Sequence, residues 1–432
     1  MNEYYKIEEI CKVKGGKRIP QGCTLQEIPN GHPYIRILDM YQGRILNISG
    51  EMQYAREEYW DIIKNYIVKK EDVILAIVGN TLGMVSVIGD TLDGANLTEN
   101  CCKFNDLDTD KVRKLFLYYS LIAPLNQKNI QKFKVGSSQP KLPIYNINQL
   151  LVPKWSVDIQ DKIVSILSAI DSKIENNNKI NAELESMAKT IYDYWFLQFE
   201  FPNADGKPYK SSGGKMVWDE ELKREIPENW RIDLLGNLFT SNRGISYNSK
   251  TIEGNGVPMI NLASFNIDGS YKEEGIKVYS GEYSAEKVVK PFDLLMCNTQ
   301  QTAIDYKKDI IGKSFLVPDI FDGDIVSSHH VTTIQVKKDN MKYFLHRLFN
   351  TAYFHKYAAG FTNGTNILGL IFSGIERYKL EIPDDTVLDK FAKLMLDIEM
   401  KKSKIIKVNQ ELISLRDFLL PLLMNGQVGF KN

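Results

Sequence analysis

The chain has no hydrophobic run long enough to cross a membrane. Its longest apolar stretches, such as residues 73–78 and 419–424, are far shorter than the roughly 20 residues that a spanning helix needs. The first residues, Met1-Asn2-Glu3-Tyr4, also lack the basic and then apolar pattern of a secretory signal. We therefore expect a cytoplasmic protein that binds no membrane.

Cysteine is scarce, and its spacing argues against both disulfides and zinc. The five cysteines are odd in number and include no Cys-x-x-Cys pair. We expect reduced and mostly buried thiols, no bound metal and no cofactor. The cysteines are Cys11, Cys23, Cys101, Cys102 and Cys297.

An excess of positive charge is also missing, because 54 basic residues face 54 acidic ones. A strongly basic domain is the usual electrostatic mark of a nucleic-acid-binding protein, so the overall charge gives that function no support. The distribution is nevertheless uneven. Residues 111–141 contain seven basic residues and no acidic one, and such a stripe can hold phosphates. A solvated helix face is the alternative interpretation.

The sequence repeats itself once, at half its length. A duplication this long predicts two similar whole domains and a pseudo-two-fold arrangement, rather than a stack of short repeats. The matched segments are 5–13 with 230–238, 31–35 with 256–260, 68–75 with 289–296, and 161–162 with 389–390.

The first part of each half mixes short strand patterns with helical ones. Strand-like runs rich in β-branched residues are bounded by Gly, Asn and Asp, and the helical stretches 111–123 and 341–357 interrupt them. We expect an α+β domain with a curved mixed sheet in each half. The strand-like runs are 34–37, 73–78, 84–88, 259–260, 294–296 and 331–336.

The second part of each half follows the alternating 4,3 spacing of a coiled-coil seam. Because the pattern has the same register in both halves, we expect the two helices to pair. The predicted seam is Ile166, Ile170, Lys173, Asn177, Ile180, Leu184, Met187, Ile191 and Tyr194, and in the second copy Leu394, Ile398, Lys401, Ile405, Val408, Leu412, Leu415, Leu419 and Leu422.

The direction of pairing can be argued from two seam lysines. Lys173 and Lys401 hold the same position in their helices, so a parallel pair would place two ammonium groups in one desolvated layer. An antiparallel pair separates them and places the two globular parts at opposite ends. Each helix, about 38 residues long, would span roughly 57 Å and act as a ruler.

Several further stretches belong to a known pattern. They are residues 161–178, Trp195-Phe196, the turn-rich segment 206–214, Ile226-Pro227-Glu228-Asn229-Trp230, and 422–428. On these residues the whole chain resembles the specificity subunit of Type I restriction-modification systems.

The resemblance implies an α+β fold with two similar mixed-sheet target-recognition domains, separated by two long helices that form an antiparallel coiled coil. It implies five parts. These are recognition domain 1 (1–155), helix 1 (156–200), a linker (201–230), recognition domain 2 (231–383) and helix 2 (384–427).

The resemblance also implies a non-catalytic reader of double-stranded DNA. Each recognition domain would read one half of a bipartite target, and the helices would fix the spacer between the halves. The partners implied are two methyltransferase subunits and, in the full complex, restriction and translocase subunits.

A search for catalytic chemistry finds little. No Asn-Pro-Pro-Tyr motif occurs, and Gly312-Lys313-Ser314 lacks the upstream glycine of a phosphate loop. Asp384, Glu399 and Lys401 are the residue types of a nuclease metal site. They cannot form one, because the two carboxylates would lie about 22 Å or more apart along a helix. His329 and His330 would point to opposite faces of a strand. We predict no catalytic and no metal-binding residue.

For DNA contact, Asn and Gln can pair with adenine, Arg and Lys with guanine, and Ser or Thr with phosphate. Ordinary turn chemistry is the alternative, since loops use the same residues. The second-half counterpart of Gly136–Lys141, Gly360–Asn366, lacks the glutamine. The candidates are Asn80, Thr81, Lys132, Lys134, Ser137, Ser138, Gln139, Lys141, Arg243, Thr299, Gln300, Gln301, Thr362, Asn363, Thr365 and Asn366.

Two functions of other classes stay open. A coiled-coil adaptor that binds only proteins would agree with the neutral charge. A standalone DNA-modifying enzyme would require the motifs that the sequence lacks. Sequence-selective DNA binding that weakens with salt separates the reader from the adaptor.

Overall fold

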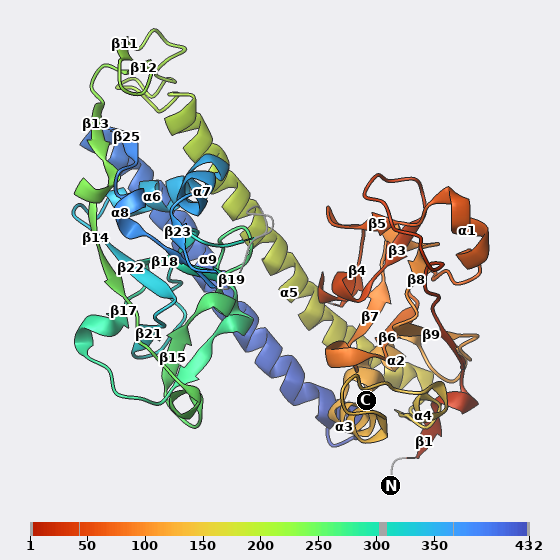
Figure 1. Ribbon diagram of the computed structural model, residues 1–432. Coiled ribbons are helices and arrows are strands. Elements are labelled where there is room, and N and C mark those ends of the chain that lie inside the picture. Colours follow the sequence, from red (N-terminus) through yellow and green to blue (C-terminus); the bar gives the residue numbers. More distant parts are fainter. Residues whose placement is uncertain (1–2, 43, 302–308, 366, 430–432) are drawn as a thin grey trace. The chain divides into compact units, whose positions relative to one another are not determined.

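The computed structural model describes residues 3–42, 44–301, 309–365 and 367–429 (Figure 1). The chain divides into two compact units, the first made of residues 1–175 with 410–432 and the second of residues 176–409. Each unit contains a mixed α/β part and one stretch of each long helix. We call these α/β parts the first head (strands β1 to β10) and the second head (β13 to β25). None of the described helices is long and apolar enough to cross a membrane.

The first head contains two small mixed sheets. One has the order β2-β9-β6-β7-β4 and the other β5-β3-β8, with parallel pairs at β4–β7 and β3–β8. A further pair, β1 with β10, joins the two ends of the head. The strands are β1 (Tyr4–Lys6), β2 (Lys12–Gly15), β3 (Pro33–Ile35), β4 (Ile45–Leu46), β5 (Gln53–Tyr54), β6 (Val73–Ala76), β7 (Val85–Ile88), β8 (Asn96–Leu97), β9 (Cys101–Asn105) and β10 (Leu151–Pro153).

The second head has a similar topology, but among the described residues its main sheet has no strand in the place of β4. Its sheets have the orders β14-β22-β18-β20 and β16-β15-β21-β17, and β13 pairs with β25 as β1 does with β10. The predicted duplication and the mixed sheets are therefore confirmed. The strands are β13 (Arg231–Leu234), β14 (Phe239–Arg243), β15 (Val257–Ile260), β16 (Lys277–Tyr279), β17 (Val288–Val289), β18 (Leu294–Cys297), β20 (Ser314–Leu316), β21 (Ile325–Ser327), β22 (Val331–Val336) and β25 (Lys379–Ile382).

The central strand of each head is buried on both faces. Because side chains alternate along a strand, Val73 and Leu75 enter the core shared with the head helix, whereas Ile74 and Ala76 enter a second core on the other face. In β18, Leu294–Cys297 divide between two cores in the same way. This explains why both strands are continuous apolar runs rather than alternating ones.

Short helices cover one face of each main sheet. The predicted helical stretch 111–123 contains α2, and 341–357 contains α6 and the start of α7. Residues 216–227, within the expected linker, form a β-hairpin, and Trp230 just beyond it stacks on Phe201 with ring centroids 5.5 Å apart. The elements are α1 (Glu57–Ile63), α2 (Lys114–Ile122), α3 (Pro124–Phe133), α4 (Ile144–Ile147), α6 (Met341–Phe349), α7 (Ala352–Ala359), α8 (Phe372–Ile375), β11 (Met216–Asp219) and β12 (Arg224–Pro227).

The long helices are α5 (Val157–Tyr192), which ends in one π-helical turn, and α9 (Asp385–Met424). In the second unit, Asn177 donates a hydrogen bond to Asn409 at 2.7 Å, and Lys402 donates one to Glu185 at 2.6 Å. Because a later residue of α5 contacts an earlier residue of α9, the two helices are antiparallel.

The first unit shows the same direction. Arg416 of α9 donates a hydrogen bond to Asp171 at 3.1 Å, and the Trp155 indole, just before α5, donates one to the Met424 carbonyl at 3.3 Å. The predicted antiparallel coiled coil is confirmed by the contacts inside each unit.

Half of the predicted seam is wrong by one residue. The seam alternates between two sets of positions. The set that contains Ile170 and Ile398 is buried as expected, but in the other set the buried residue is one position later than predicted, and this shift is the same in both helices. A 4,3 pattern allows either choice, and contact with the heads decides it, since Leu167 lies in the core beneath α2. Exposed predicted positions are Ile166, Lys173, Ile180, Met187, Tyr194, Lys401 and Leu415, whereas Leu167, Ala188, Met395, Asn409 and Leu423 are buried.

Lys173 and Lys401 are consequently exposed, so the predicted direction is right for a different reason. Two asparagines that lie in the seam face each other, Asn177 and Asn409, with exposed fractions of 4% and 7%. A buried asparagine pair costs stability in any register that leaves its amides unpaired. We infer that this pair helps to fix the register.

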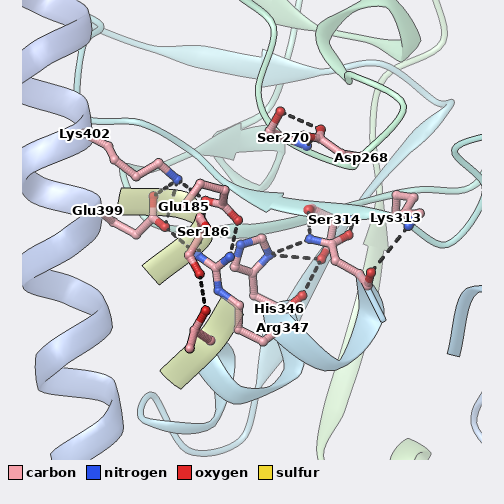
Figure 2. A network of polar contacts seen from close by, with 12 residues as sticks. Glu185, Ser186, Asp268, Ser270, Lys313, Ser314, His346, Arg347, Glu399 and Lys402 are labelled. Atoms are coloured by element: carbon pink, nitrogen blue, oxygen red, sulfur yellow. Dashed lines mark hydrogen bonds and ion pairs between the residues drawn. The ribbon is translucent and has the colours of Figure 1, made fainter. Parts of the chain in front are cut away.

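A buried ionic network joins the second head to both long helices (Figure 2). Arg347 of α6 donates a hydrogen bond to Glu399 of α9 at 3.0 Å and also binds Glu185 of α5. Lys402 contacts both carboxylates, at 2.6 Å and 3.1 Å. Burial alone would raise the pKa of Glu185, but Arg347 and Lys402 outweigh it and hold that pKa well below its usual range.

The first head uses the same position on its own long helix. The Tyr119 hydroxyl of α2 donates a hydrogen bond to the buried Asp171 at 2.6 Å. Asp171 lies as far along α5 from Asp161 as Glu399 lies along α9 from Asp389. Asp161 and Asp389, part of the duplicated pattern, each bind the residue before the head helix, Arg113 at 3.1 Å and Asn340 at 2.7 Å.

Replacing Arg347 with methionine is expected to lower the free energy of unfolding by about 2–4 kcal/mol, because two carboxylates would lose their buried cation. The lower part of this range allows for Glu185, whose side chain is 30% exposed. Urea unfolding followed by circular dichroism measures the loss. The matched control is the quadruple variant R347M/E185Q/E399Q/K402M, which removes every charge of the network, Lys402 included, and should recover much of the stability at pH 7. No recovery would show that packing of Arg347 matters rather than charge.

Candidate nucleic-acid interface

In the first head, most of the predicted contact residues gather at the end of the central strand. Val135 and Lys141 form a bridge that closes a short hairpin loop, and Lys141 also bridges to Val78. The Leu142 amide donates a hydrogen bond to the Ile77 carbonyl at 2.9 Å. The structure therefore brings residues 137–141 beside Asn80 and Thr81.

Most of these side chains are open to solvent. Asn80, Ser137, Ser138 and Gln139 are exposed, whereas Thr81 is half-buried and its hydroxyl lies 3.3 Å from the Val78 carbonyl. An exposed run of hydroxyl and amide groups offers both donors and acceptors to base edges and phosphates. The geometry leaves these groups accessible for the predicted contacts.

The basic stripe of residues 111–141 separates into two parts. Its first three cations are ion-paired with carboxylates outside the stripe: Lys111 with Asp108 at 2.8 Å, Arg113 with Asp161 at 3.1 Å and Lys114 with Asp72 at 3.6 Å. The other four are exposed and form no ion pair with any described residue. They are Lys128, Lys132, Lys134 and Lys141, on α3 and the hairpin.

The second head carries a hairpin in the corresponding place. Strands β23 (Thr362–Asn363) and β24 (Ile367–Leu370) pair with each other, and β24 pairs with β19 (Thr299–Gln301). The Leu370 amide donates to the Asn298 carbonyl at 2.9 Å, as Leu142 does to Ile77. The two hairpins are thus equivalent although their sequences differ.

Not all predicted residues in the second head can reach DNA. Asn363 and Thr365 are exposed, and Thr362 is half-buried. Thr299 and Gln300 are only 4% and 5% exposed, so we remove both from the set of contact residues. Asn366 lies outside the described residues, as does the side chain of Gln301.

Arg243 is exposed at the end of β14. It lies beside His329 and His330, which the sequence pattern places on a strand. Its Nε donates a hydrogen bond to the His329 carbonyl at 2.8 Å. His329 and His330 form a turn rather than a strand, and their rings lie on the same side with centroids 3.8 Å apart. The prediction that they point to opposite faces is therefore wrong.

A glycine allows the chain to cross this turn in each head. A Cβ on Gly244 would lie 2.3 Å from the Ser327 carbonyl oxygen, and one on Gly16 would lie 2.1 Å from that of Thr98. Neither backbone contact could form with a larger residue. These paired glycines are a sequence signal that marks the turn and that the motif search missed.

The residues of the superficial nuclease motif have structural roles. The Asp384 carboxylate accepts a hydrogen bond from the Val387 amide at 3.1 Å and so caps α9, while Glu399 binds Arg347 and Lys402. In the described part of the chain, no three His, Cys, Asp or Glu side chains lie close enough to hold a metal ion.

Comparison with known proteins gives consistent matches. Residues 2–186 match the family described as "Type I restriction modification DNA specificity domain". The chain is 25% identical over 427 residues to the Type I restriction enzyme MjaIX specificity subunit of Methanocaldococcus jannaschii, covering 98% of this chain and 92% of that protein. It is 20% identical over 371 residues to the HindI specificity subunit of Haemophilus influenzae, covering 72% and 77%.

A solved structure has a similar fold. The S subunit of a Type I restriction-modification system from M. genitalium superposes with a TM-score of 0.52 at 14% sequence identity, covering 98% of this chain and 95% of that one.

Changing Lys128, Lys132, Lys134 and Lys141 to glutamine is expected to weaken binding to any duplex and to reduce its salt dependence. The slope of log K against log salt should fall by about 0.9 for each phosphate that the variant no longer neutralises. Fluorescence anisotropy at several salt concentrations measures this slope. The matched control is K111Q/K114Q, which removes cations that are already ion-paired. Equal reductions in the two variants would contradict a local phosphate-binding surface.

Proposed function

We propose that the chain reads a bipartite target in double-stranded DNA with two recognition domains, and that it has no catalytic activity of its own. The premise is that the chain belongs to the family of Type I restriction-modification DNA specificity subunits. The domains would comprise residues 1–155 and 231–383. The protein would act in the cytoplasm with two methyltransferase subunits and, in a complete system, with restriction and translocase subunits.

The observation that carries this proposal is the equivalence of the two hairpins. Both are attached to the end of a central strand by the same backbone hydrogen bond, from Leu142 to Ile77 and from Leu370 to Asn298. Their exposed side chains differ, with Ser137 to Gln139 in one and Asn363 with Thr365 in the other. Matching scaffolds with different exposed groups are what two readers of different half-sites require.

The proposed contacts use the chemistry of each side chain. Amides can bond adenine in a bidentate manner, lysine and arginine can bond guanine or phosphate, and hydroxyls can bond phosphate. The proposed residues are Asn80, Thr81, Lys132, Lys134, Ser137, Ser138, Gln139, Lys141, Arg243, Gln301, Thr362, Asn363, Thr365 and Asn366.

The long helices offer a surface for protein partners. On α9, the apolar side chains of Leu415 and Phe418, about one helical turn apart, are 46% and 65% exposed. Exposed apolar residues that gather on a folded surface often mark a binding site. We propose that the methyltransferase subunits bind the helices, which leaves the hairpins free for DNA.

Exchanging residues 231–383 for the second recognition domain of another family member is expected to change one half of the methylated motif and leave the other half and the spacer unchanged. Sequencing of methylated DNA from cells that carry the variant and its methyltransferase shows the motif. A simultaneous change in both halves would contradict modular reading. Failure of the wild-type complex to select any DNA sequence would instead favour an adaptor that binds only proteins.

Lengthening both helices is expected to lengthen the spacer. Four residues inserted in α5 after Asn177, with four inserted in α9 between Val408 and Asn409 so that Asn177 still faces Asn409, add about 6 Å along the coil, and a base pair adds about 3.4 Å. The same two half-sites should then be separated by one or two more base pairs. Four residues inserted in α5 alone form the control, which should disturb the pairing and reduce activity. An active double-insertion variant with an unchanged spacer would refute the ruler.

A further inference from the structure

The turn at His329 and His330 has a counterpart in the first head, at Glu99 and Asn100. The Gly244 amide donates to the Val331 carbonyl at 3.0 Å, as Gly16 does to Cys101 at 2.9 Å. The Asn298 amide donates to the His330 carbonyl at 3.0 Å, as Ile77 does to Asn100 at 2.8 Å. The two turns therefore occupy the same place in the duplicated fold.

The two turns differ in charge. In the first head, Glu99 binds Arg18 at 2.8 Å, so the turn is electrically balanced. In the second head, the two histidines replace the glutamate and asparagine, and Arg243 forms no ion pair with any described residue. Its Nε is held by the His329 carbonyl, which leaves the rest of the guanidinium without a counter-charge.

Further cations adjoin the histidine turn. The Tyr247 ring lies 5.7 Å from that of His329, and the Lys277 ammonium of β16 lies 5.1 Å from the Tyr247 ring and 3.4 Å from its hydroxyl. On the other side, Lys287 donates to the Arg243 carbonyl at 2.7 Å. No carboxylate of the described chain is ion-paired with any of these three cations.

The surroundings keep both imidazoles neutral. Burial and then Arg243 lower the pKa of His329, while burial, His329, Arg243 and Lys277 lower the pKa of His330 to about 4. The Nδ1 atom of each ring is buried without a hydrogen-bond partner. An unpaired acceptor is less costly than an unpaired N–H, which favours the tautomer that carries its proton on Nε2. Both rings thus lie within a cationic environment.

The turn is also adjacent to the hairpin. Asn298 receives the Leu370 amide on its carbonyl and donates its own amide to His330. Its side chain donates to the Thr332 hydroxyl at 2.7 Å and to the His329 carbonyl at 3.2 Å. One residue therefore fixes the histidine turn against β24, so a DNA strand read by the hairpin would pass close to the turn.

We propose that Arg243, Lys277, His329 and His330 form a site for one DNA backbone phosphate beside the half-site read by the second head. This inference rests on the proposed function and adds to it a site that positions the DNA without selecting bases. The first head lacks the site because Glu99 occupies the equivalent turn and would repel a phosphate.

A bound phosphate would reverse the effect of the cations on the histidines. Its negative charge favours the imidazolium form, so the pKa of at least one ring rises in the complex above its value in the free protein. Binding then takes up a proton. DNA affinity should increase as the pH falls below the pKa in the complex, by at most about tenfold for each pH unit.

The test compares the wild-type chain with H329Q/H330Q, because glutamine keeps a polar side chain but cannot become charged. Anisotropy with a duplex that contains the methylated motif is measured between pH 6 and 8 and at several salt concentrations. The variant should bind every duplex more weakly, lose the gain in affinity at low pH, and show a salt slope smaller by about one. The methylated motif should remain unchanged.

The control variant is Glu99→Gln in the first head, which frees Arg18 and should not weaken binding. Unchanged affinity and pH dependence in H329Q/H330Q would overturn the phosphate site, and so would a change in the second half of the motif, which would show base reading. The single variant R243Q is a second test of the same site that leaves both histidines in place, and it should also reduce the salt slope. Loss of sequence selection by the wild-type protein would instead overturn the proposed function.

Discussion

The structure depends on a buried carboxylate at the same position of each long helix. Asp171 and Glu399 are only 4% and 7% exposed, and a carboxylate so deeply buried is costly unless it is paired. The partner that each carboxylate finds on a head, Tyr119 or Arg347, therefore ties the packing of that head to the packing of the helices. Head and helices belong to one compact unit in both halves, and the division of the chain passes across the helices instead of between a head and its helix.

Much of the fold was predictable because its signals are local. The duplication, the mixed sheets and the two helices all follow from short repeating patterns of apolar residues. The seam was only half right, because a 4,3 pattern around Ile170 is compatible with a second layer at Ile166 or at Leu167. The choice depends on which face of the helix packs against the core of the head. That core contains Phe116, which is distant from the helix in the sequence.

The candidate site was less predictable because it is formed by long-range contacts. Composition alone selected the hairpin of residues 135–141, but the bridge that places it beside Val78 has no local signal. The burial of Thr299 and Gln300 likewise has no local signal in the sequence. The sequence favours a strand at His329 because a β-branched run follows it, and only the close approach of Gly244 shows that the chain turns there.

The burial of the central strands supports our proposal that recognition lies in the hairpins. Every side chain of Val73–Ala76 and of Leu294–Cys297 is buried between two cores, so none is free to contact a base. The chain can present variable side chains only beyond the end of the strand. The hydrogen bonds that attach the hairpins there, Leu142 to Ile77 and Leu370 to Asn298, use backbone atoms alone. A backbone bond tolerates any side chain that can form the strand, so the hairpin residues that we propose to read DNA can change while their position relative to the scaffold is kept.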